Sequence, residues 1–249
     1  MPRIDPNYSF HLLSDTALEI RLGEQIDPAV LDQVLQLTQH FKRHPPEGLS
    51  DIIPSYTRVT LRFDPYRIGP GGLTDLASLL SNSLPSLETY PPSAYPTIHL
   101  PVCYEGIGAT DLQLLSEKLQ LSVREIIDLH TAQPFRVYML GFLPGFPYLG
   151  ILPDSLHVPR KSKPEMVAAG TVAIAAAQTG IYPADSPGGW WRIGRTPLQL
   201  FQPTDERTTL FEPGDQVQFH SVDQVAFAEI QSQATQYSLA ALREKGGWI

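Results

Sequence analysis

The chain of 249 residues is 42% hydrophobic and 18% charged, and its formal net charge is −8. The length allows one large or two small globular domains. Nucleic acids are bound through clustered lysines and arginines, and the densest basic stretch here is only Arg160-Lys161-Ser162-Lys163, which argues against a nucleic-acid partner. A lone cysteine, Cys103, excludes an internal disulfide and a cysteine-based metal site.

The sequence also lacks signals for export and for familiar catalytic machinery. The N-terminus has no apolar signal-peptide core, and the longest small-apolar run, residues 167–177, falls short of the roughly 20 residues of a membrane helix. We therefore expect a cytoplasmic protein without a membrane partner. There is no Walker phosphate loop, nucleophile elbow, two-histidine zinc helix or dinucleotide fingerprint, so no self-contained active site and no metal site is predicted.

The N-terminal part of the chain alternates between strand and helix patterns. Residues 8–22 predict two short strands, because apolar residues there recur at every second position. Asp27-Pro28 predicts the start of a helix that ends before Pro45. A second strand pair over residues 52–63 and a short helix over residues 73–80 follow. This order predicts a small α+β domain.

A break in the pattern separates this part from the rest of the chain. Prolines accumulate between residues 84 and 96, so we expect an N-terminal α+β domain over residues 1–90 and a second domain over residues 91–249. The second domain opens with a strand at residues 98–102.

Two helices with capping-box patterns follow this strand. The patterns pair Thr110 with Gln113 and Ser122 with Glu125. Short strands and turns from residue 135 to residue 219 then predict a closed or nearly closed barrel, with expected strands at residues 135–142, 172–177, 191–194, 198–201 and 216–219. Residues 222–243 predict a helical tail.

The most informative region lies between residues 130 and 197, where glycine, proline and aromatic residues alternate. Such a composition fixes unusual backbone shapes and places flat rings beside them. After His130, the segments are Leu140-Gly141-Phe142-Leu143-Pro144-Gly145-Phe146-Pro147-Tyr148-Leu149, Val158-Pro159-Arg160, Ala169-Gly170-Thr171-Val172-Ala173-Ile174, Gln178-Thr179-Gly180-Ile181-Tyr182-Pro183, Ser186-Pro187-Gly188-Gly189-Trp190 and Ile193-Gly194-Arg195-Thr196-Pro197. This ordered set resembles the family named for allophanate hydrolase subunit 1 and a sporulation kinase inhibitor, and within it the B subunit of 5-oxoprolinase.

The resemblance covers nearly the whole chain, most strongly residues 100–219. It implies a cyclophilin-like barrel for the second domain and two partners, the C subunit of 5-oxoprolinase and, further, its A subunit. It also implies an enzyme that uses ATP, with magnesium, to open the lactam of 5-oxoproline and give glutamate. The resemblance implies ATP for the assembled complex, and no cofactor is evident in this chain alone. The chemistry calls for ATP because an unstrained lactam is resonance-stabilised, and phosphorylating its oxygen makes it a better electrophile.

Three positions depart from the family pattern. Glu165 stands near a place that usually holds a second arginine, and Ala168 stands where proline is usual, in a segment one residue shorter. Residues 105–111 replace a more glycine-rich turn. Because an arginine replaced by glutamate reverses charge at a possible anion contact, these departures bear on the substrate more than on the fold.

Three polar residues in this region are the candidates for catalysis. His130 ends a helix pattern and would either cap that helix or act as a base near neutral pH. Arg160 would bind a carboxylate or phosphate, with a solvated surface arginine as the alternative. Gln178 would orient a carbonyl or a water, or stabilise the turn that follows it.

Five further residues are the candidates for binding substrate: Phe142, Phe146, Tyr182, Trp190 and Arg195. For Phe142 and Phe146 the alternative is packing. Tyr182 and Trp190 would line a pocket or face the partner. Arg195 would bind ligand or pair with Asp185 inside the barrel.

Other functions remain open at this point. The chain would be an inhibitor of a sensor histidine kinase, or a component of allophanate hydrolysis, if it followed other members of the family. Peptidyl-prolyl isomerase activity is suggested by the barrel shape alone, and a fold does not carry a function.

Overall fold

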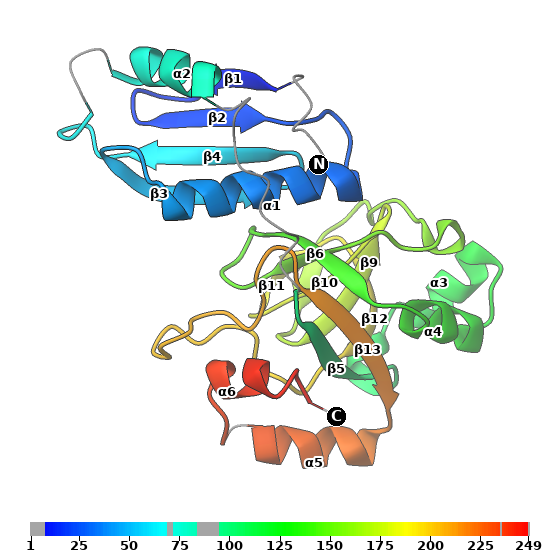
Figure 1. The fold of residues 1–249 in the computed structure, drawn as a ribbon. Helices are drawn as coiled ribbons and strands as arrows, with labels where there is room; N and C mark the ends of the chain where they lie inside the picture. The colour runs from blue at the N-terminus through cyan, green and yellow to red at the C-terminus, as the bar shows by residue number, and fades with distance from the viewer. Residues whose placement is uncertain (1–7, 69–71, 84–94, 235, 249) are drawn as a thin grey trace. The chain divides into compact units, whose positions relative to one another are not determined.

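The computed structural model describes residues 8–68, 72–83, 95–234 and 236–248. The chain divides into two compact units, Met1–Ala94 and Tyr95–Ile249 (Figure 1). The boundary expected between residues 90 and 91 falls within residues 84–94, which lie outside the described residues, so its exact position stays a prediction. The α+β class is confirmed.

The first unit is a four-stranded antiparallel sheet with helices. The strands lie in the order β1-β2-β4-β3, and α1 packs against β3 and β4. The Asp27 carboxylate accepts a hydrogen bond from the Ala29 amide at 2.7 Å, so α1 begins as predicted. The elements are β1 (Ser9–Leu12), β2 (Ala17–Arg21), α1 (Pro28–Arg43), β3 (Leu49–Ser55), β4 (Arg58–Phe63) and α2 (Gly72–Ser83).

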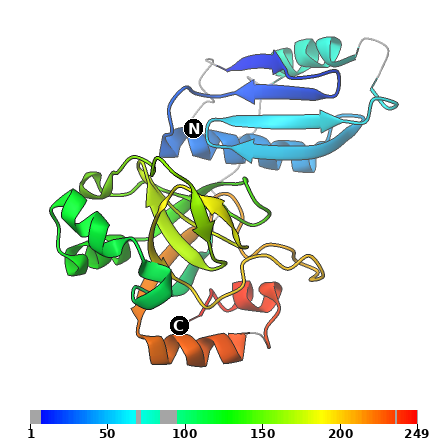
Figure 2. The ribbon, with the colours of Figure 1, turned by 180° about the vertical axis from the view of Figure 1, so that it is seen from behind.

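The second unit is a closed barrel of seven strands in the order β10-β7-β6-β13-β5-β12-β9, which closes on itself (Figure 2). Its strands are β5 (Thr97–Cys103), β6 (Phe135–Leu140), β7 (Pro147–Gly150), β9 (Thr171–Ala175), β10 (Gln178–Ile181), β12 (Trp191–Arg195) and β13 (Gln216–Val222). A separate two-stranded ribbon pairs β8 (Glu165–Val167) with β11 (Ser186–Gly188). The predicted barrel is therefore confirmed.

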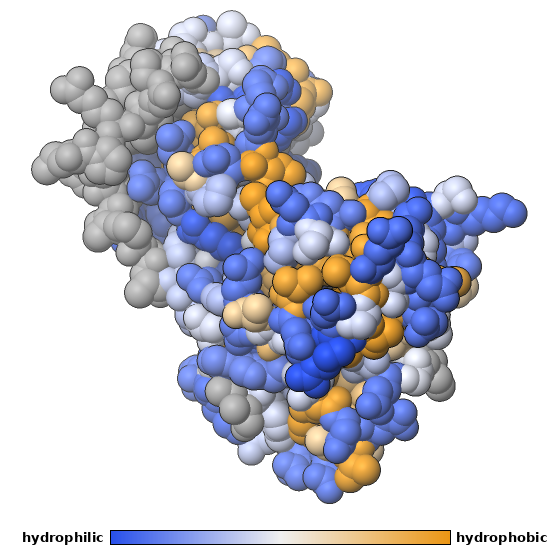
Figure 3. All heavy atoms as spheres, turned by 90° about the vertical axis from the view of Figure 1, so that its right-hand side faces the viewer, coloured by the Kyte–Doolittle hydropathy of each residue, from blue (hydrophilic) through white to orange (hydrophobic). Residues whose placement is uncertain are grey.

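Helices cover the outside of the barrel. They are the 3₁₀ turns η2 (Gly106–Ala109) and η3 (Asp154–Leu156), and the helices α3 (Leu112–Leu119), α4 (Val123–Thr131), α5 (Gln224–Ala234) and α6 (Leu239–Glu244). On the face that carries α3 and α4, hydrophobic residues lie among hydrophilic ones (Figure 3). Leu114 of α3 is one of the exposed apolar residues. None of the helices within the described residues has both the length and the apolar character needed to cross a membrane.

Several expectations for this unit need correction. The tail predicted as one helical segment is two helices, and residues 198–201 form no strand beyond a single bridge from Phe201 to Thr209. The capping box at Ser122 and Glu125 is confirmed. The one expected at Thr110 is wrong, because α3 begins after Asp111, whose carboxylate is engaged by basic side chains instead of the helix amides.

A buried ion pair ties the C-terminal helices to the barrel. Asp215 is fully buried, and both of its carboxylate oxygens accept hydrogen bonds from the guanidinium of Arg243 on α6. Asp215 also accepts a hydrogen bond from the Glu212 amide at 2.6 Å. These charge-assisted bonds satisfy a carboxylate that would be costly to bury alone.

Candidate functional site

Strand β10 separates two environments. Thr179 and Ile181 point into the apolar interior of the barrel, and because side chains alternate along a strand, Gln178 and Gly180 face outward. Outside the barrel, a Cβ added at Gly180 would lie 2.8 Å from Phe146 Cζ and 3.0 Å from Trp190 Cζ3. The glycine is therefore needed for aromatic rings to lie against this strand.

Five rings gather on this outer face. Phe146 lies at their centre, with ring centroids 5.8 Å from Phe142, 4.8 Å from Tyr148, 5.1 Å from Tyr182 and 5.7 Å from Trp190. Several of these pairs are edge-to-face, the arrangement that the ring quadrupoles favour. We call this set, Phe142, Phe146, Tyr148, Tyr182 and Trp190, the aromatic cluster. Four of its members were predicted as substrate-binding residues from the sequence.

Arg160 is the cation beside the aromatic cluster. Its guanidinium carbon lies 5.8 Å from the centroid of the Trp190 ring, within cation–π range. Burial raises the pKa of the Tyr148 and Tyr182 hydroxyls, and the positive charge of Arg160 opposes this rise. Arg160 therefore lies beside the aromatic cluster, and Gln178 begins the strand against which the cluster packs.

The loop before β7 holds Phe142 in an unusual position. Its φ is +67°, in the left-handed region that residues other than glycine seldom adopt, and 62% of the residue is exposed. The Leu143 amide donates to the Gly141 carbonyl at 2.8 Å across this tight turn. Phe142 therefore forms the exposed rim of the aromatic cluster, whereas Phe146 is buried within it.

His130 lies elsewhere, inside the barrel. It is fully buried, its Nδ1 is 2.7 Å from the Tyr104 hydroxyl, its Nε2 is 2.9 Å from Thr179 Oγ1, and its ring stacks on Phe219 at 4.4 Å. Burial lowers its pKa to about 3. The expectation that His130 acts as a base near neutral pH is corrected, because the residue is fully buried inside the barrel, where substrate does not reach it. It is a neutral residue of the core.

Arg195 also lies apart from the aromatic cluster, at the end of β12. Its Nε donates to the Ala169 carbonyl at 2.9 Å, while Asp185 accepts from the Ala169 amide at 2.7 Å. The two side chains thus hold the same residue and do not form the expected pair with each other. Arg195 lines a pocket of about 270 Å³ beside η2.

A network of four charges was not predicted from the sequence. Asp111 Oδ1 accepts from Arg192 Nη2, and Oδ2 accepts from Arg192 Nε and from Lys161 Nζ, each at 2.8 Å. Glu165 Oε2 accepts from the same two basic residues, at 2.5 Å from Arg192 and 3.0 Å from Lys161. Burial raises the pKa of Asp111, but the bonds to Arg192 and Lys161 outweigh this effect and lower the pKa to about 2. The glutamate that departs from the family pattern therefore neutralises neighbouring cations.

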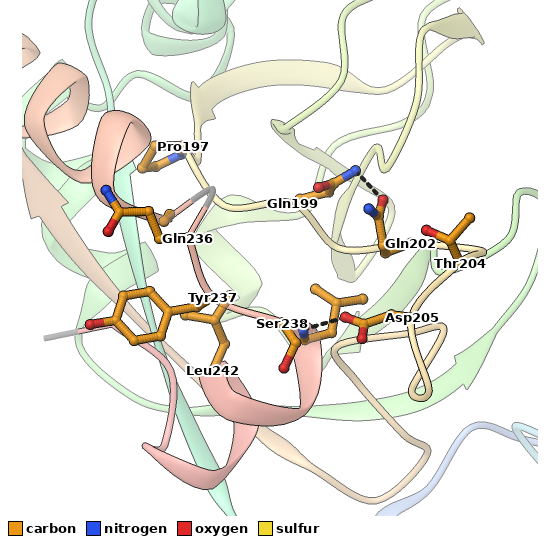
Figure 4. Close-up of a pocket in the computed structure, with 11 residues that line it drawn as sticks. Pro197, Gln199, Gln202, Thr204, Asp205, Gln236, Tyr237, Ser238 and Leu242 are labelled. Carbon is orange, nitrogen blue, oxygen red and sulfur yellow. Dashed lines mark hydrogen bonds between the residues drawn. The ribbon is translucent and has the colours of Figure 1, made fainter.

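A further cavity of about 290 Å³ lies between residues 197–205 and the C-terminal helices (Figure 4). The Asp205 carboxylate there accepts from the Leu239 amide at 2.7 Å, and Gln199 donates to Gln202 at 2.9 Å. These bonds hold the loop against α6. None of the residues predicted for the site lines this cavity.

Comparison with known proteins identifies the family. The pattern of the family described as carboxyltransferase domain, subdomain C and D, matches residues 8–211. The chain belongs to this family. Among members of known name, it is 37% identical over 220 residues to the 5-oxoprolinase B subunit of Bacillus subtilis, covering 85% of this chain and 92% of that protein. It is 36% identical over 211 residues to the 5-oxoprolinase B subunit of Escherichia coli O157:H7, covering 84% and 94%. The chain is thus a homologue of the B subunit of 5-oxoprolinase.

Two solved structures agree on the fold. The crystal structure of TTHA0988 matches with a TM-score of 0.71 and 36% identity over 83% of this chain, and this chain spans only 40% of that protein. The Kluyveromyces lactis urea carboxylase matches with a TM-score of 0.74 and 18% identity, covering 94% of this chain and 23% of that protein. At that identity the second likeness concerns the fold alone.

Proposed function

We propose that the chain is the B subunit of a bacterial, cytoplasmic, ATP-dependent 5-oxoprolinase, which opens the lactam of 5-oxoproline to give glutamate. The observation that carries the proposal is 37% identity to the B subunit of a 5-oxoprolinase over 92% of that protein's length. The enzyme is assembled with the C subunit, and a further partner is the A subunit. ATP, with magnesium, acts in the assembled complex.

The match to TTHA0988 supports a partner in close association. This chain corresponds to 40% of that longer chain, so in TTHA0988 the equivalent of this protein is covalently joined to further sequence. An active site shared between two domains needs both of them, so two such domains on separate chains would have to associate.

For the chemistry, we propose that Arg160 and Gln178 act at the face formed by the aromatic cluster. Phosphorylation of a lactam oxygen and attack on the activated carbonyl both create negative charge on oxygen. Such charge is stabilised by preorganised cations and neutral donors in a site that excludes water. Arg160 supplies the cation, Gln178 supplies an amide, and the ring-lined surface supplies rigid apolar walls. His130, neutral and inside the barrel, supports β10 from within and does not meet substrate.

The decisive experiment is reconstitution. The purified chain alone should show no 5-oxoproline-dependent ATP hydrolysis, and addition of the C subunit should produce it, with release of glutamate measured in the same reaction. Robust turnover by the single chain would contradict the proposal, as would an assembled pair that hydrolyses ATP without regard to 5-oxoproline. Inhibition of a histidine kinase by the chain would favour the alternative role.

A further inference from the structure

The pocket beside η2 differs in chemistry from the face that carries the aromatic cluster. It is lined by Cys103 at the end of β5, Glu105 after it, Gly106 and Gly108 of η2, Arg195 of β12, and Gln224 and Phe227 of α5. Three separate parts of the barrel unit therefore meet at one hollow of about 270 Å³. This is slightly below the roughly 300–1,000 Å³ of typical ligand pockets, a size suited to one small metabolite.

Two opposite charges line this pocket without pairing. Arg195 uses Nε for the Ala169 carbonyl, and within the described residues its Nη1 and Nη2 make no hydrogen bond or ion pair. In the same part of the structure the Glu105 carboxylate accepts no hydrogen bond and forms no ion pair, and the Gln224 amide makes no hydrogen bond. The pocket thus holds a guanidinium and a carboxylate that do not pair with each other. A ligand that carries both an anionic and a cationic group can bridge them.

The remaining walls favour a small aliphatic body between the charges. Gly108 leaves no room for a side chain, because an added Cβ would overlap the Cβ of Arg195, and Gly106 adopts a φ of +67°. Phe227 supplies an apolar wall. Burial raises the pKa of the Cys103 thiol, so it stays neutral and acts as a further apolar surface near neutral pH.

We propose that this pocket binds a free α-amino acid, with its carboxylate on Arg195 and its ammonium on Glu105. The amino-acid class follows from the two unpaired charges. Its identity rests on the proposed function, because opening of 5-oxoproline releases glutamate, and the pocket then holds the product. Glu105 lies in the turn where the sequence departs from the more glycine-rich family pattern, so recognition of the ammonium is a property of this chain.

The test is titration calorimetry of the isolated full-length chain with glutamate and, separately, with 5-oxoproline. 5-Oxoproline keeps the carboxylate but has a lactam nitrogen in place of the ammonium. Glutamate should bind and 5-oxoproline should bind at least about tenfold more weakly, which corresponds to about 1.4 kcal/mol. Glu105→Gln should weaken glutamate binding at least about tenfold, since it removes the negative charge that pairs with the ammonium of the ligand. Arg195→Gln should do the same.

Two matched substitutions away from this pocket serve as controls. Glu117→Gln, on the exposed surface of α3, and Arg124→Ala, on the exposed surface of α4, should leave glutamate binding unchanged. The Glu105 carboxylate makes no hydrogen bond or ion pair to described residues, so Glu105→Gln should fold even if Arg195→Gln does not. Absence of glutamate binding, equal binding of 5-oxoproline, or no effect of Glu105→Gln would overturn the proposal. Because this readout needs neither ATP nor the C subunit, its failure is distinguishable from failure of the reconstituted activity.

Discussion

The Tyr104 hydroxyl and Nδ1 of His130 lie 2.7 Å apart in the interior of the barrel, and the second ring nitrogen of His130 is 2.9 Å from the Thr179 hydroxyl. A neutral imidazole donates from one nitrogen and accepts at the other, and a hydroxyl can play either part. The pairing therefore satisfies a neutral histidine completely. Burial lowers the pKa of His130 to about 3 and raises that of Tyr104 well above its usual value.

The buried histidine should make the barrel unit sensitive to acid. The unfolded chain takes up a proton near pH 6.5, whereas the folded chain resists protonation until about pH 3. Between these values the unfolded state binds more protons, so the free energy of unfolding should fall by about 1.4 kcal/mol for each unit that the pH drops. His130→Gln keeps a donor and an acceptor without titrating, and should remove this contribution.

Denaturant unfolding at several pH values measures this effect. All three tryptophans, Trp190, Trp191 and Trp248, lie in the second unit, so their fluorescence reports unfolding of the barrel. An unchanged slope in His130→Gln would mean that His130 does not stay neutral in the folded barrel.

The packing at Gly180 supports a second prediction. Gly180→Ala should destabilise the barrel unit by about 1–3 kcal/mol, because the new methyl group meets the buried rings of Phe146 and Trp190. Gly189→Ala, whose Cβ would lie 3.4 Å from the Lys161 carbonyl oxygen, should cost much less. Thermal unfolding followed by tryptophan fluorescence compares the two variants. Equal stability of the two variants would show that the rings of Phe146 and Trp190 move to accommodate the new methyl group at little cost.

How far the sequence could predict the structure depends on what determines each element. Helix α1 follows from a cap and a proline at its start, and β2 from its own alternation, so both were predicted from local pattern. Strands β7 and β10 were not, because Pro147 and Gly180 weaken a strand pattern and barrel closure decides their pairing. Tertiary context overrides local preference there.

In the candidate site, too, some features follow from local sequence and others depend on tertiary contacts. The glycine- and proline-rich turns bring Phe146, Tyr182 and Trp190 together, so the aromatic residues and Arg160 could be predicted as a group. The proposed role of His130 as a base was wrong. Ile126 lies four residues earlier, on the same face of the helix, and this apolar neighbour was a usable signal that His130 faces the core. The partners of Asp111 come from positions 50 and 81 residues later, and no local pattern indicates them.

The charge network around Asp111 should stabilise the barrel unit, and most of this effect should come from Asp111. The Asp111 side chain is 7% exposed, and Asp111→Asn would leave the guanidinium of Arg192, 18% exposed, without its principal partner. We expect a loss of about 2–3 kcal/mol in the free energy of unfolding. Glu165→Gln, at a side chain that is 52% exposed, should cost less than about 1 kcal/mol.

The network's acid response follows from the pKa of Asp111. The unfolded carboxylate takes up a proton near pH 3.8 and the folded one at about pH 2, so stability present above pH 3.8 should be lost as the pH falls toward 2. This window lies below most of the window expected for His130. A wild-type pH profile in Asp111→Asn would contradict the role given to the network.

The last prediction concerns Arg160 in the assembled enzyme. Arg160→Ala should lower 5-oxoproline-dependent ATP hydrolysis by the assembled pair at least about tenfold, or about 1.4 kcal/mol of transition-state stabilisation, because it removes the cation beside the aromatic cluster. Gln178→Ala should cost less, since a neutral donor contributes less than a charged one. Arg124→Ala is the matched control: Arg124 is exposed on α4, where it pairs with Asp128 at 2.9 Å, and its loss should leave activity unchanged. Co-purification with the C subunit should survive all three changes if Arg160 faces substrate. The opposite result is that Arg160→Ala prevents co-purification while Gln178→Ala leaves the rate of the assembled pair intact. In that case the face carrying the aromatic cluster binds the partner. The groups that stabilise the anionic oxygens then belong to the C subunit.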